Sequence, residues 1–219
     1  SSAASDVYKR QVLEERRLRT DDNPQALLGE AARATAFQTS PYRQPVIGWA
    51  ADIQSMTVED LADWYRQWYA PNNATVVVVG DVDPQEVYEA AKTHLGVIDP
   101  QPINPPKNRP EVPQKGRKDV TITNDKARVP YLLMSYKTPT LTTIHANDND
   151  TNKIAVEEWE IYALDVLAST LDGGDSARLP KNLIREKRIA AQVSAGYNPS
   201  SRLTSLFSFS GSPSPVSYT

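Results

Sequence analysis

Residues 57–87 have the sequence TVEDLADWYRQWYAPNNATVVVVGDVDPQEV, which predicts a helix, a strand and a second helix in that order. Thr57 and Asp60 have the spacing of a capping box, so the first helix is expected to begin there. The β-branched run within residues 74–80 is typical of a buried strand, on which the first helix is expected to pack. Asp-Pro at residues 83–84 predicts the start of the second helix.

Regular elements are also predicted on both sides of this segment. Residues 12–37 have a helical composition that Asp-Asp-Asn-Pro at 21–24 interrupts, so two helical segments are expected. Six prolines between Pro100 and Pro113 predict an extended linker, because proline cannot continue a helix or an inner strand. Beyond the linker the sequence predicts strands at residues 120–122, 129–136, 190–197 and 203–210, a long helix that ends at Gly173-Gly174, and a helix at 176–188.

This order of elements predicts an α+β fold with two domains, each mixing helices with an antiparallel sheet. The domains are residues 12–99 and 119–219, and residues 100–118 form the linker between them. Residues 1–11 have no usable periodicity and are expected to be a non-native leader. The aromatic residues at helical spacing are predicted to lie in the core: Trp64 and Trp68 in the first domain, Trp159 and Tyr162 in the second.

The composition excludes several classes of partner. The chain has 24 basic and 27 acidic residues, spread along its length, with no basic stripe of the kind that nucleic acid requires. Its longest apolar run, Val76 to Val79, is far shorter than the roughly 20 residues of a membrane span. It has no cysteine, so disulfides and thiolate metal sites are excluded.

The spacing of residues in the sequence reveals no complete active site. The two histidines, His94 and His145, lack the spacing that would place both on one metal ion. No nucleophile elbow, phosphate-binding loop or dinucleotide fingerprint is present. The residues by themselves therefore predict the fold class but no reaction.

Eight short segments, in a fixed order, carry a resemblance to a known family. They are residues 12–19 (VLEERRLR), 23–28 (NPQALL), 41–49 (PYRQPVIGW), 56–61 (MTVEDL), 68–74 (WYAPNNA), 76–84 (VVVVGDVDP), 176–179 (SARL) and 183–187 (LIREK). Together they resemble the pitrilysin/insulinase family of zinc metallopeptidases, particularly its bacterial members. The resemblance implies a clamshell that encloses peptides between two halves. The two predicted domains are then the end of a zinc-side domain and the beginning of a second, non-zinc domain, both truncated.

The resemblance also implies a zinc ligand in this chain. The family holds zinc with an H-x-x-E-H motif and a glutamate roughly eighty residues downstream, and that glutamate aligns with Glu15. Glu14 is the adjacent candidate, but neighbours on a helix point about 100° apart, and the resemblance favours Glu15. Without that resemblance, the Glu-Glu-Arg-Arg run is typical of a solvated helix face. Since the chain lacks H-x-x-E-H, we expect no catalytic residue in it and no zinc held by it alone.

A second implied site residue is Arg185. In the family an arginine, with a tyrosine seven residues later, grips the substrate backbone. Arg185 matches the arginine, whereas the tyrosine position is Gln192, so the pair is incomplete. From the residues alone, Arg185 is equally a surface arginine that pairs with an acid.

Two functions remain open for the protein from which this chain comes. One is a zinc endopeptidase acting on peptides, for which bacterial relatives imply a periplasmic location. The other is an inactive homologue that serves as partner or scaffold for an active subunit, and the change at Gln192 is consistent with it.

Overall fold

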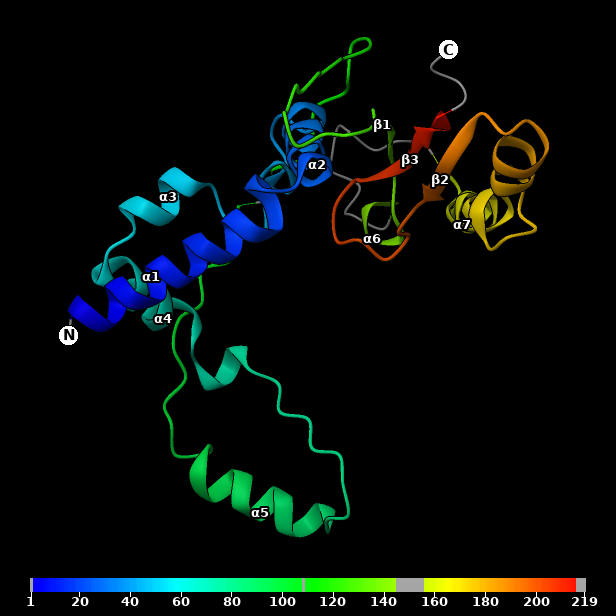
Figure 1. Ribbon diagram of the computed structural model, residues 1–219. Coiled ribbons are helices and arrows are strands. Elements are labelled where there is room, and N and C mark those ends of the chain that lie inside the picture. The colour runs from blue at the N-terminus through cyan, green and yellow to red at the C-terminus, as the bar shows by residue number, and fades with distance from the viewer. Residues whose placement is uncertain (1, 108, 145–155, 216–219) are drawn as a thin grey trace. The chain divides into compact units, whose positions relative to one another are not determined.

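The computed structural model describes residues 2–107, 109–144 and 156–215, with side chains from residue 6 onward (Figure 1). The chain forms two compact units, which are described separately. Unit 1 comprises Ser1–Gln11 and Ala50–Asn108, and unit 2 comprises Val12–Trp49 and Arg109–Thr219. The predicted domains at 12–99 and 119–219 stay a prediction, and the α+β class is that of the described chain.

Unit 1 is helical in its described residues. Its elements are the first part of α1 (Ser2–Arg16), α3 (Ala50–Ser55), α4 (Val58–Trp68), the 3-10 turn η3 (Pro71–Asn73) and α5 (Pro84–His94). The capping box of α4 is confirmed, since Thr57 N donates to Asp60 at 2.8 Å and Asp60 N donates to Thr57 Oγ1 at 3.2 Å. The start of α5 is confirmed as well, because Asp83 Oδ1 accepts from Gln85 N at 2.7 Å.

The predicted strand at residues 74–80 is absent from the described structure. These residues have no regular structure, and Val77 and Val79 are 78% and 93% exposed. A strand requires a paired neighbour, and the described residues of unit 1 supply none. The aromatic face of α4 therefore has no sheet to cover, and Trp64 is 56% exposed, so the prediction that it lies in the core is wrong here.

The first helix begins earlier than predicted. α1 starts at Ser2, whereas the sequence predicts no element before Val12. Lys, Arg and Gln favour helix, so the helical turns extend back from Val12 through Lys9, Arg10 and Gln11. Lys9 attaches this part of α1 to the end of α3, donating to the carbonyl oxygens of Gln54 at 3.1 Å and Met56 at 3.2 Å.

The helices at the start of unit 2 follow the prediction. α1 continues into a π-helical turn, η1 (Arg17–Asp21), and α2 (Pro24–Ala36) follows, then the short 3-10 turn η2 (Pro41–Arg43). Asn23 caps α2 by accepting from Gln25 N at 3.0 Å and Ala26 N at 3.2 Å. The predicted interruption at residues 21–24 is therefore confirmed.

The sheet of unit 2 has three antiparallel strands in the order β1-β3-β2. They are β1 (Leu132–Thr138), β2 (Ala190–Gly196) and β3 (Ser205–Pro213). The strands predicted at residues 190–197 and 203–210 are confirmed, although β3 begins at Ser205 and extends to Pro213, and the two pair with Ala195 opposite Phe209. The strand predicted at 129–136 begins instead at Leu132, and residues 120–122 have no strand, because no described strand lies in register beside them.

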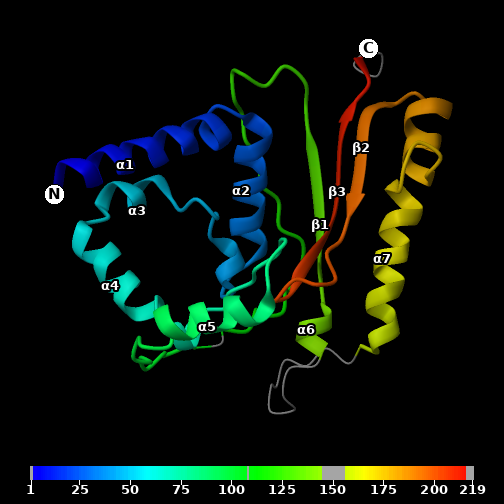
Figure 2. The ribbon, with the colours of Figure 1, turned by 90° about the horizontal axis from the view of Figure 1, so that it is seen from below.

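Helices lie on both sides of this sheet. α7 (Glu158–Asp172) contacts β2, and α2 contacts β1 (Figure 2). A short helix, α6 (Leu141–Ile144), and a π-helical segment, η4 (Pro180–Glu186), complete the unit. Asp172 at the end of α7 accepts a hydrogen bond from Ala195 N at 3.1 Å, which attaches the helix to β2. Gly173-Gly174 ends α7 as predicted, and the φ of +126° at Gly174 is one that side chains disfavour.

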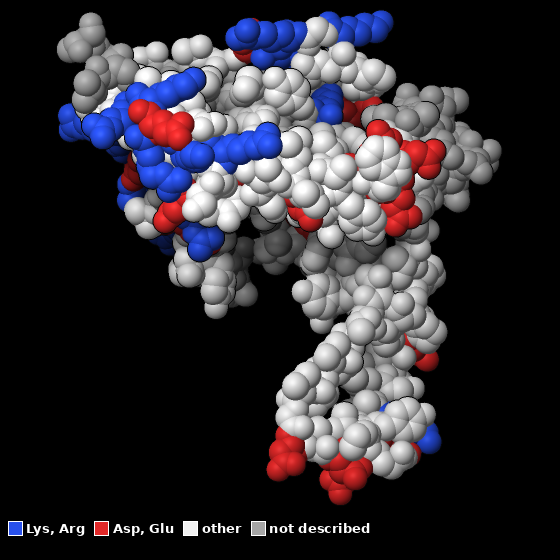
Figure 3. Space-filling model, turned by 90° about the vertical axis from the view of Figure 1, so that its right-hand side faces the viewer, with Lys and Arg blue, Asp and Glu red and all other residues white. Residues whose placement is uncertain are grey.

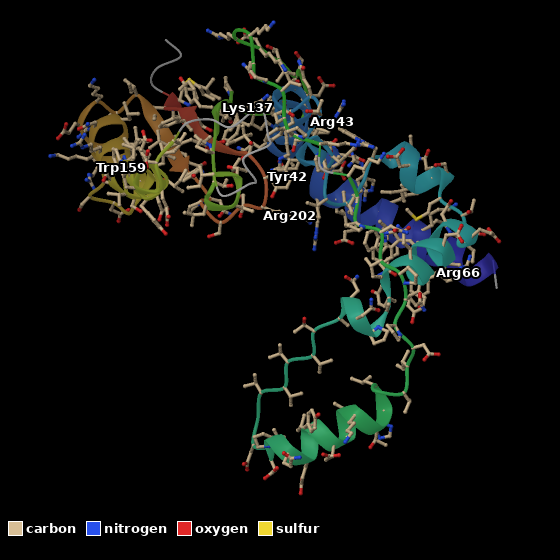
Figure 4. The ribbon with its side chains drawn as sticks, turned by 180° about the vertical axis from the view of Figure 1, so that it is seen from behind. Tyr42, Arg43, Arg66, Lys137, Trp159 and Arg202 are labelled. Atoms are coloured by element: carbon tan, nitrogen blue, oxygen red, sulfur yellow. The ribbon has the colours of Figure 1, made fainter. Side chains whose placement is uncertain are left out.

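The core of unit 2 is small. Phe37, Ile161, Ala168 and Phe207 are its buried apolar side chains. Tyr197 stacks on Phe207 with ring centroids 6.0 Å apart and donates to the carbonyl of Pro139 at 2.5 Å. Trp159 is 67% exposed on α7, so its predicted place in the core is wrong for the described chain (Figure 4). No helix within the described ranges is both long and apolar enough to cross a membrane.

Candidate functional site

Glu15 lies in the last turn of α1, immediately before η1. Its Oε1 atom forms an ion pair with Arg19 Nη1 at 2.9 Å, and its side chain is 43% exposed. Arg19 is more exposed still, so solvent weakens the pair. Within the described part of the chain the Glu15 side chain has no ion-pair partner besides Arg19 and accepts no hydrogen bond, so its carboxylate stays partly accessible to a ligand.

Glu14 differs from its neighbour because both of its oxygens are bound. Arg17 donates from Nε to Oε2 at 2.9 Å and from Nη2 to Oε1 at 2.6 Å. This side-chain hydrogen bonding from Arg17 lowers the pKa of the Glu14 carboxyl. Arg17 also contacts Asp22, which in turn accepts from Lys126 Nζ at 2.5 Å. Glu14 thus belongs to a surface charge network.

The orientation of both glutamates follows from Arg16, which comes directly after Glu15 and is buried. Its guanidinium donates to the two carboxylate oxygens of Glu30, each at 2.8 Å, and to the carbonyl of Gly48 at 2.9 Å. Hydrogen bonding to Glu30 raises the pKa of Arg16 above its ordinary value. Since neighbours on a helix point about 100° apart, burying Arg16 turns Glu15 toward the surface.

The described residues do not make a zinc site by themselves. A catalytic zinc takes three protein ligands and one open position. In the part of the chain that the structure describes, no three His, Cys, Asp or Glu residues are grouped to hold a metal ion. His94 ends α5 in unit 1, and His145 lies outside the described residues. One carboxylate, Glu15, is chemically suited to zinc but does not suffice.

Arg185 lies in η4 and is exposed. It has no ion pair and no side-chain hydrogen bond with the residues that the structure describes. The expected alternative, a surface arginine paired with an acidic residue, is therefore not seen among them. Gln192, at the position of the missing tyrosine, lies in β2 opposite Ser212, next to a register shift in the ladder. Tyr197 does not replace that tyrosine, because its hydroxyl already donates to Pro139 O.

A buried carboxylate that sequence reasoning missed lies at the end of the proline-rich stretch. Glu111 accepts from the backbone N–H groups of Gln38 at 3.0 Å, Thr39 at 3.0 Å and Ser40 at 2.9 Å. It also accepts from Lys137 Nζ at 2.5 Å, and its side chain is only 2% exposed. Burial opposes ionisation, but Lys137 and the three N–H donors outweigh it and lower the pKa of Glu111 to about 2.

The surroundings of Lys137 explain why Glu111 lies there. Lys137 Nζ lies 5.8 Å from the ring centroid of Phe37, which contacts Tyr42 edge-on with ring centroids 6.1 Å apart. Figure 4 shows Lys137 and Tyr42 together beside α2. Glu111 neutralises the lysine in this partly apolar setting. Its position between Pro110 and Pro113 gave no signal of burial, since an isolated glutamate in a proline-rich stretch is typical of a solvated linker.

Comparison with known proteins shows which family of proteins the chain is similar to. A family model described as the peptidase M16 inactive domain matches residues 55–219, a range that includes Arg185 and not Glu15. The zinc protease PqqE of Helicobacter pylori is 33% identical over 185 residues, which are 83% of this chain and 38% of that protein. The probable zinc protease PqqL of Escherichia coli is 31% identical over 122 residues, 54% of this chain and 12% of that protein.

Solved structures have the same fold. A protease from Helicobacter pylori has a TM-score of 0.82 and 28% identity, covering 98% of this chain and 49% of that chain. The periplasmic protease PqqL of Escherichia coli has a TM-score of 0.65 and 19% identity, covering 97% of this chain and 22% of that chain. The chain thus spans less than half the length of these relatives. Because the family model covers most of the sequence and the relatives are named zinc proteases, the chain belongs to the peptidase M16 family of pitrilysin-like metallopeptidases.

Proposed function

We propose that this chain is a segment of a zinc-dependent endopeptidase that hydrolyses peptides inside a two-halved chamber. In this proposal Glu15 supplies the downstream zinc ligand, and the histidine ligands come from a part of the protein outside this chain. The observation that carries it is the accessible carboxylate of Glu15, on a helix whose orientation the buried Arg16 fixes. The names of the relatives, zinc proteases PqqE and PqqL, support the same reaction class.

The geometry favours Glu15 over Glu14 as the ligand. A carboxylate must offer a free lone pair to bind a metal ion. Both oxygens of Glu14 accept hydrogen bonds from Arg17, so zinc binding there would first break a bidentate pair. Glu15 would give up only one exposed contact with Arg19.

Arg185 is the proposed contact with the substrate. An arginine that grips a peptide backbone needs free N–H donors, and Arg185 is exposed, with no ion pair to a described residue. Gln192 can offer an amide in place of the tyrosine hydroxyl, but with a shorter reach. We therefore expect weaker substrate gripping by this half than an Arg-Tyr pair would give. The Escherichia coli relative PqqL is a periplasmic protease, and we propose the same compartment for the parent protein.

The second candidate is an inactive homologue that acts as a partner or scaffold subunit. One observation favours it: Gln192 stands where the family has a tyrosine. The discriminating observation is the coding sequence upstream of Val12. An H-x-x-E-H motif roughly eighty residues before Glu15 supports the peptidase, and a full-length sequence without it refutes the peptidase.

Zinc retention by the full-length parent tests the role of Glu15. We expect the wild type to keep one equivalent of zinc through dialysis against a weak chelator and to cleave a quenched fluorescent peptide. Glu15→Gln should weaken zinc binding by at least about 10-fold, because it removes a direct ligand. Glu14→Gln is the matched control and should keep the zinc. Full zinc retention by Glu15→Gln would overturn the assignment.

A further inference from the structure

One short segment of unit 2 concentrates positive charge, although the whole chain has a formal charge of −3. Residues 178–188 hold five cationic side chains and a single acidic one, Glu186. We call the five the η4 cationic surface: Arg178, Lys181, Arg185, Lys187 and Arg188. All five are exposed. Figure 3 shows most of the lysine and arginine side chains of this face at one end, with a few acidic side chains among them, and further acidic side chains at the other end.

Most of these cations are unpaired within the described structure. Lys181 lies 3.9 Å from Glu186, which is a weak, exposed ion pair. The other four members of the surface form no ion pair with any residue that the structure describes. Their guanidinium and ammonium groups are therefore available to an external anion, and arginine in particular binds carboxylates through two parallel hydrogen bonds.

The backbone that carries the surface is fixed by its own hydrogen bonds. Lys187 N donates to Asn182 O at 3.0 Å, and Ile189 N donates to Leu183 O at 3.0 Å, which closes the turn after η4. Arg188 has a φ of +54°, an uncommon conformation for a residue with a side chain. The turn leads directly into β2, so the cations extend from a scaffold that the sheet supports.

We propose that the η4 cationic surface selects acidic peptide segments, so that preferred substrates carry clustered Asp or Glu residues beside the cleaved bond. This inference rests on the proposed function, because Arg185 belongs to both. Electrostatic complementarity of this kind speeds association and decides between related partners.

The charges around the surface favour a peptide over an anionic membrane. The start of α7 lies at the end of the helix away from η4 (Figure 2), and three acidic residues lie at or beside its first turn: Glu157, Glu158 and Glu160. A flat lipid surface that approached this face would meet these carboxylates together with the cations and would be repelled by them. A short acidic peptide can contact the cationic end alone.

The test uses the full-length parent and two peptides that differ only in three residues beside the cleaved bond, glutamate in one and glutamine in the other. We expect kcat/KM to be about 5- to 20-fold higher for the glutamate peptide at low ionic strength, with most of the difference lost at high salt, as screening of exposed charges requires. Arg178→Gln with Lys187→Gln should remove most of the preference. Lys107→Gln with Lys115→Gln makes the same charge change outside the surface and should keep the preference.

The outcomes separate this inference from the proposed function. Equal kcat/KM values on an active protein, or a preference that survives Arg178→Gln with Lys187→Gln, would overturn the inference. If the zinc-loaded protein cleaves neither peptide, the proposed function fails, and fluorescence anisotropy of the labelled peptides then decides the inference by binding alone. Co-sedimentation with phosphatidylglycerol vesicles that the double variant abolishes, without selective peptide binding, would assign the surface to lipid instead.

Discussion

Arg16 and Glu30 join the last turn of α1 to the middle of α2 through two parallel hydrogen bonds of 2.8 Å. Arg16 also donates to the carbonyl of Gly48, so one side chain connects three segments of unit 2. The Arg16 side chain is 6% exposed and that of Glu30 13%, so solvent screens the pair little. The rotation of α1, and with it the direction of Glu15, depends on this pair.

Arg16→Met should destabilise unit 2 strongly. The substitution leaves the Glu30 carboxylate buried without its partner, which costs about 3–5 kcal/mol of the free energy of unfolding. Urea denaturation followed by circular dichroism measures the loss. Arg19→Met is the matched control, because it removes an exposed pair and should cost less than about 1 kcal/mol. Equal stabilities of the two variants would contradict a structural role for the buried pair.

Glu111→Gln should loosen the loop that follows α2. The amide keeps the shape of the side chain but loses the charge that holds Lys137, at a cost of about 2–4 kcal/mol. Hydrogen exchange gives the specific readout: the amide offers the N–H groups of residues 38–40 one neutral oxygen in place of two charged ones, so these groups should exchange faster. Asp119→Asn, which removes an exposed carboxylate paired with Arg117, is the control and should leave these amides protected.

The pKa of the Glu111 carboxyl predicts how the stability of unit 2 depends on pH. The pKa of Glu111 is about 2 when folded and about 4.5 in an unperturbed carboxyl. Because the pKa is lower in the folded state, the ionised Glu111 contributes to the free energy of unfolding. This contribution is fully present above about pH 4.5 and is lost as the pH falls from there toward about 2. The stability difference between wild type and Glu111→Gln should shrink over that window. Urea titrations at pH 7, 4 and 3 check this, and a difference that stays constant would contradict the charged role of Glu111.

Local signals in the sequence predicted the ends of helices correctly. The side chains of Thr57 and Asn23 accept hydrogen bonds from backbone N–H groups two or three residues away, and Gly174 adopts a positive φ directly after α7. The role of each therefore depends on its neighbours in the sequence. The strands β2 and β3 were predictable as well, because the alternation of their residues is a local signal, whereas their pairing became visible only in the structure. The candidate ligand and the substrate contact came from a resemblance and not from local chemistry.

Contacts between distant residues were not predictable from pattern alone. Arg16 and Glu30 are charged residues of the kind expected on a solvated helix surface, and they become buried because η1, the continuation of α1, contacts α2. Glu111 meets Lys137 across 26 residues, and nothing in the proline-rich stretch indicates that contact. The strand predicted at 74–80 has the correct composition, but a strand also needs a partner, which the described residues do not supply.

The exposed valines of residues 76–79 should make this chain associate in solution when it is prepared by itself. Val77 and Val79 are more exposed than Val76 and Val78, and a β-branched apolar run with unpaired backbone groups is a template for pairing with another chain. We expect size-exclusion chromatography to show concentration-dependent oligomers up to on the order of 100 μM. Val77→Lys with Val79→Lys should shift the chain toward monomer without lowering its thermal stability, because neither side chain is packed. Leu18→Lys with Val46→Lys, at exposed positions outside the run, is the control and should leave the oligomers in place. A wild-type chain that elutes as a compact monomer over the whole range would show that this segment is protected in solution.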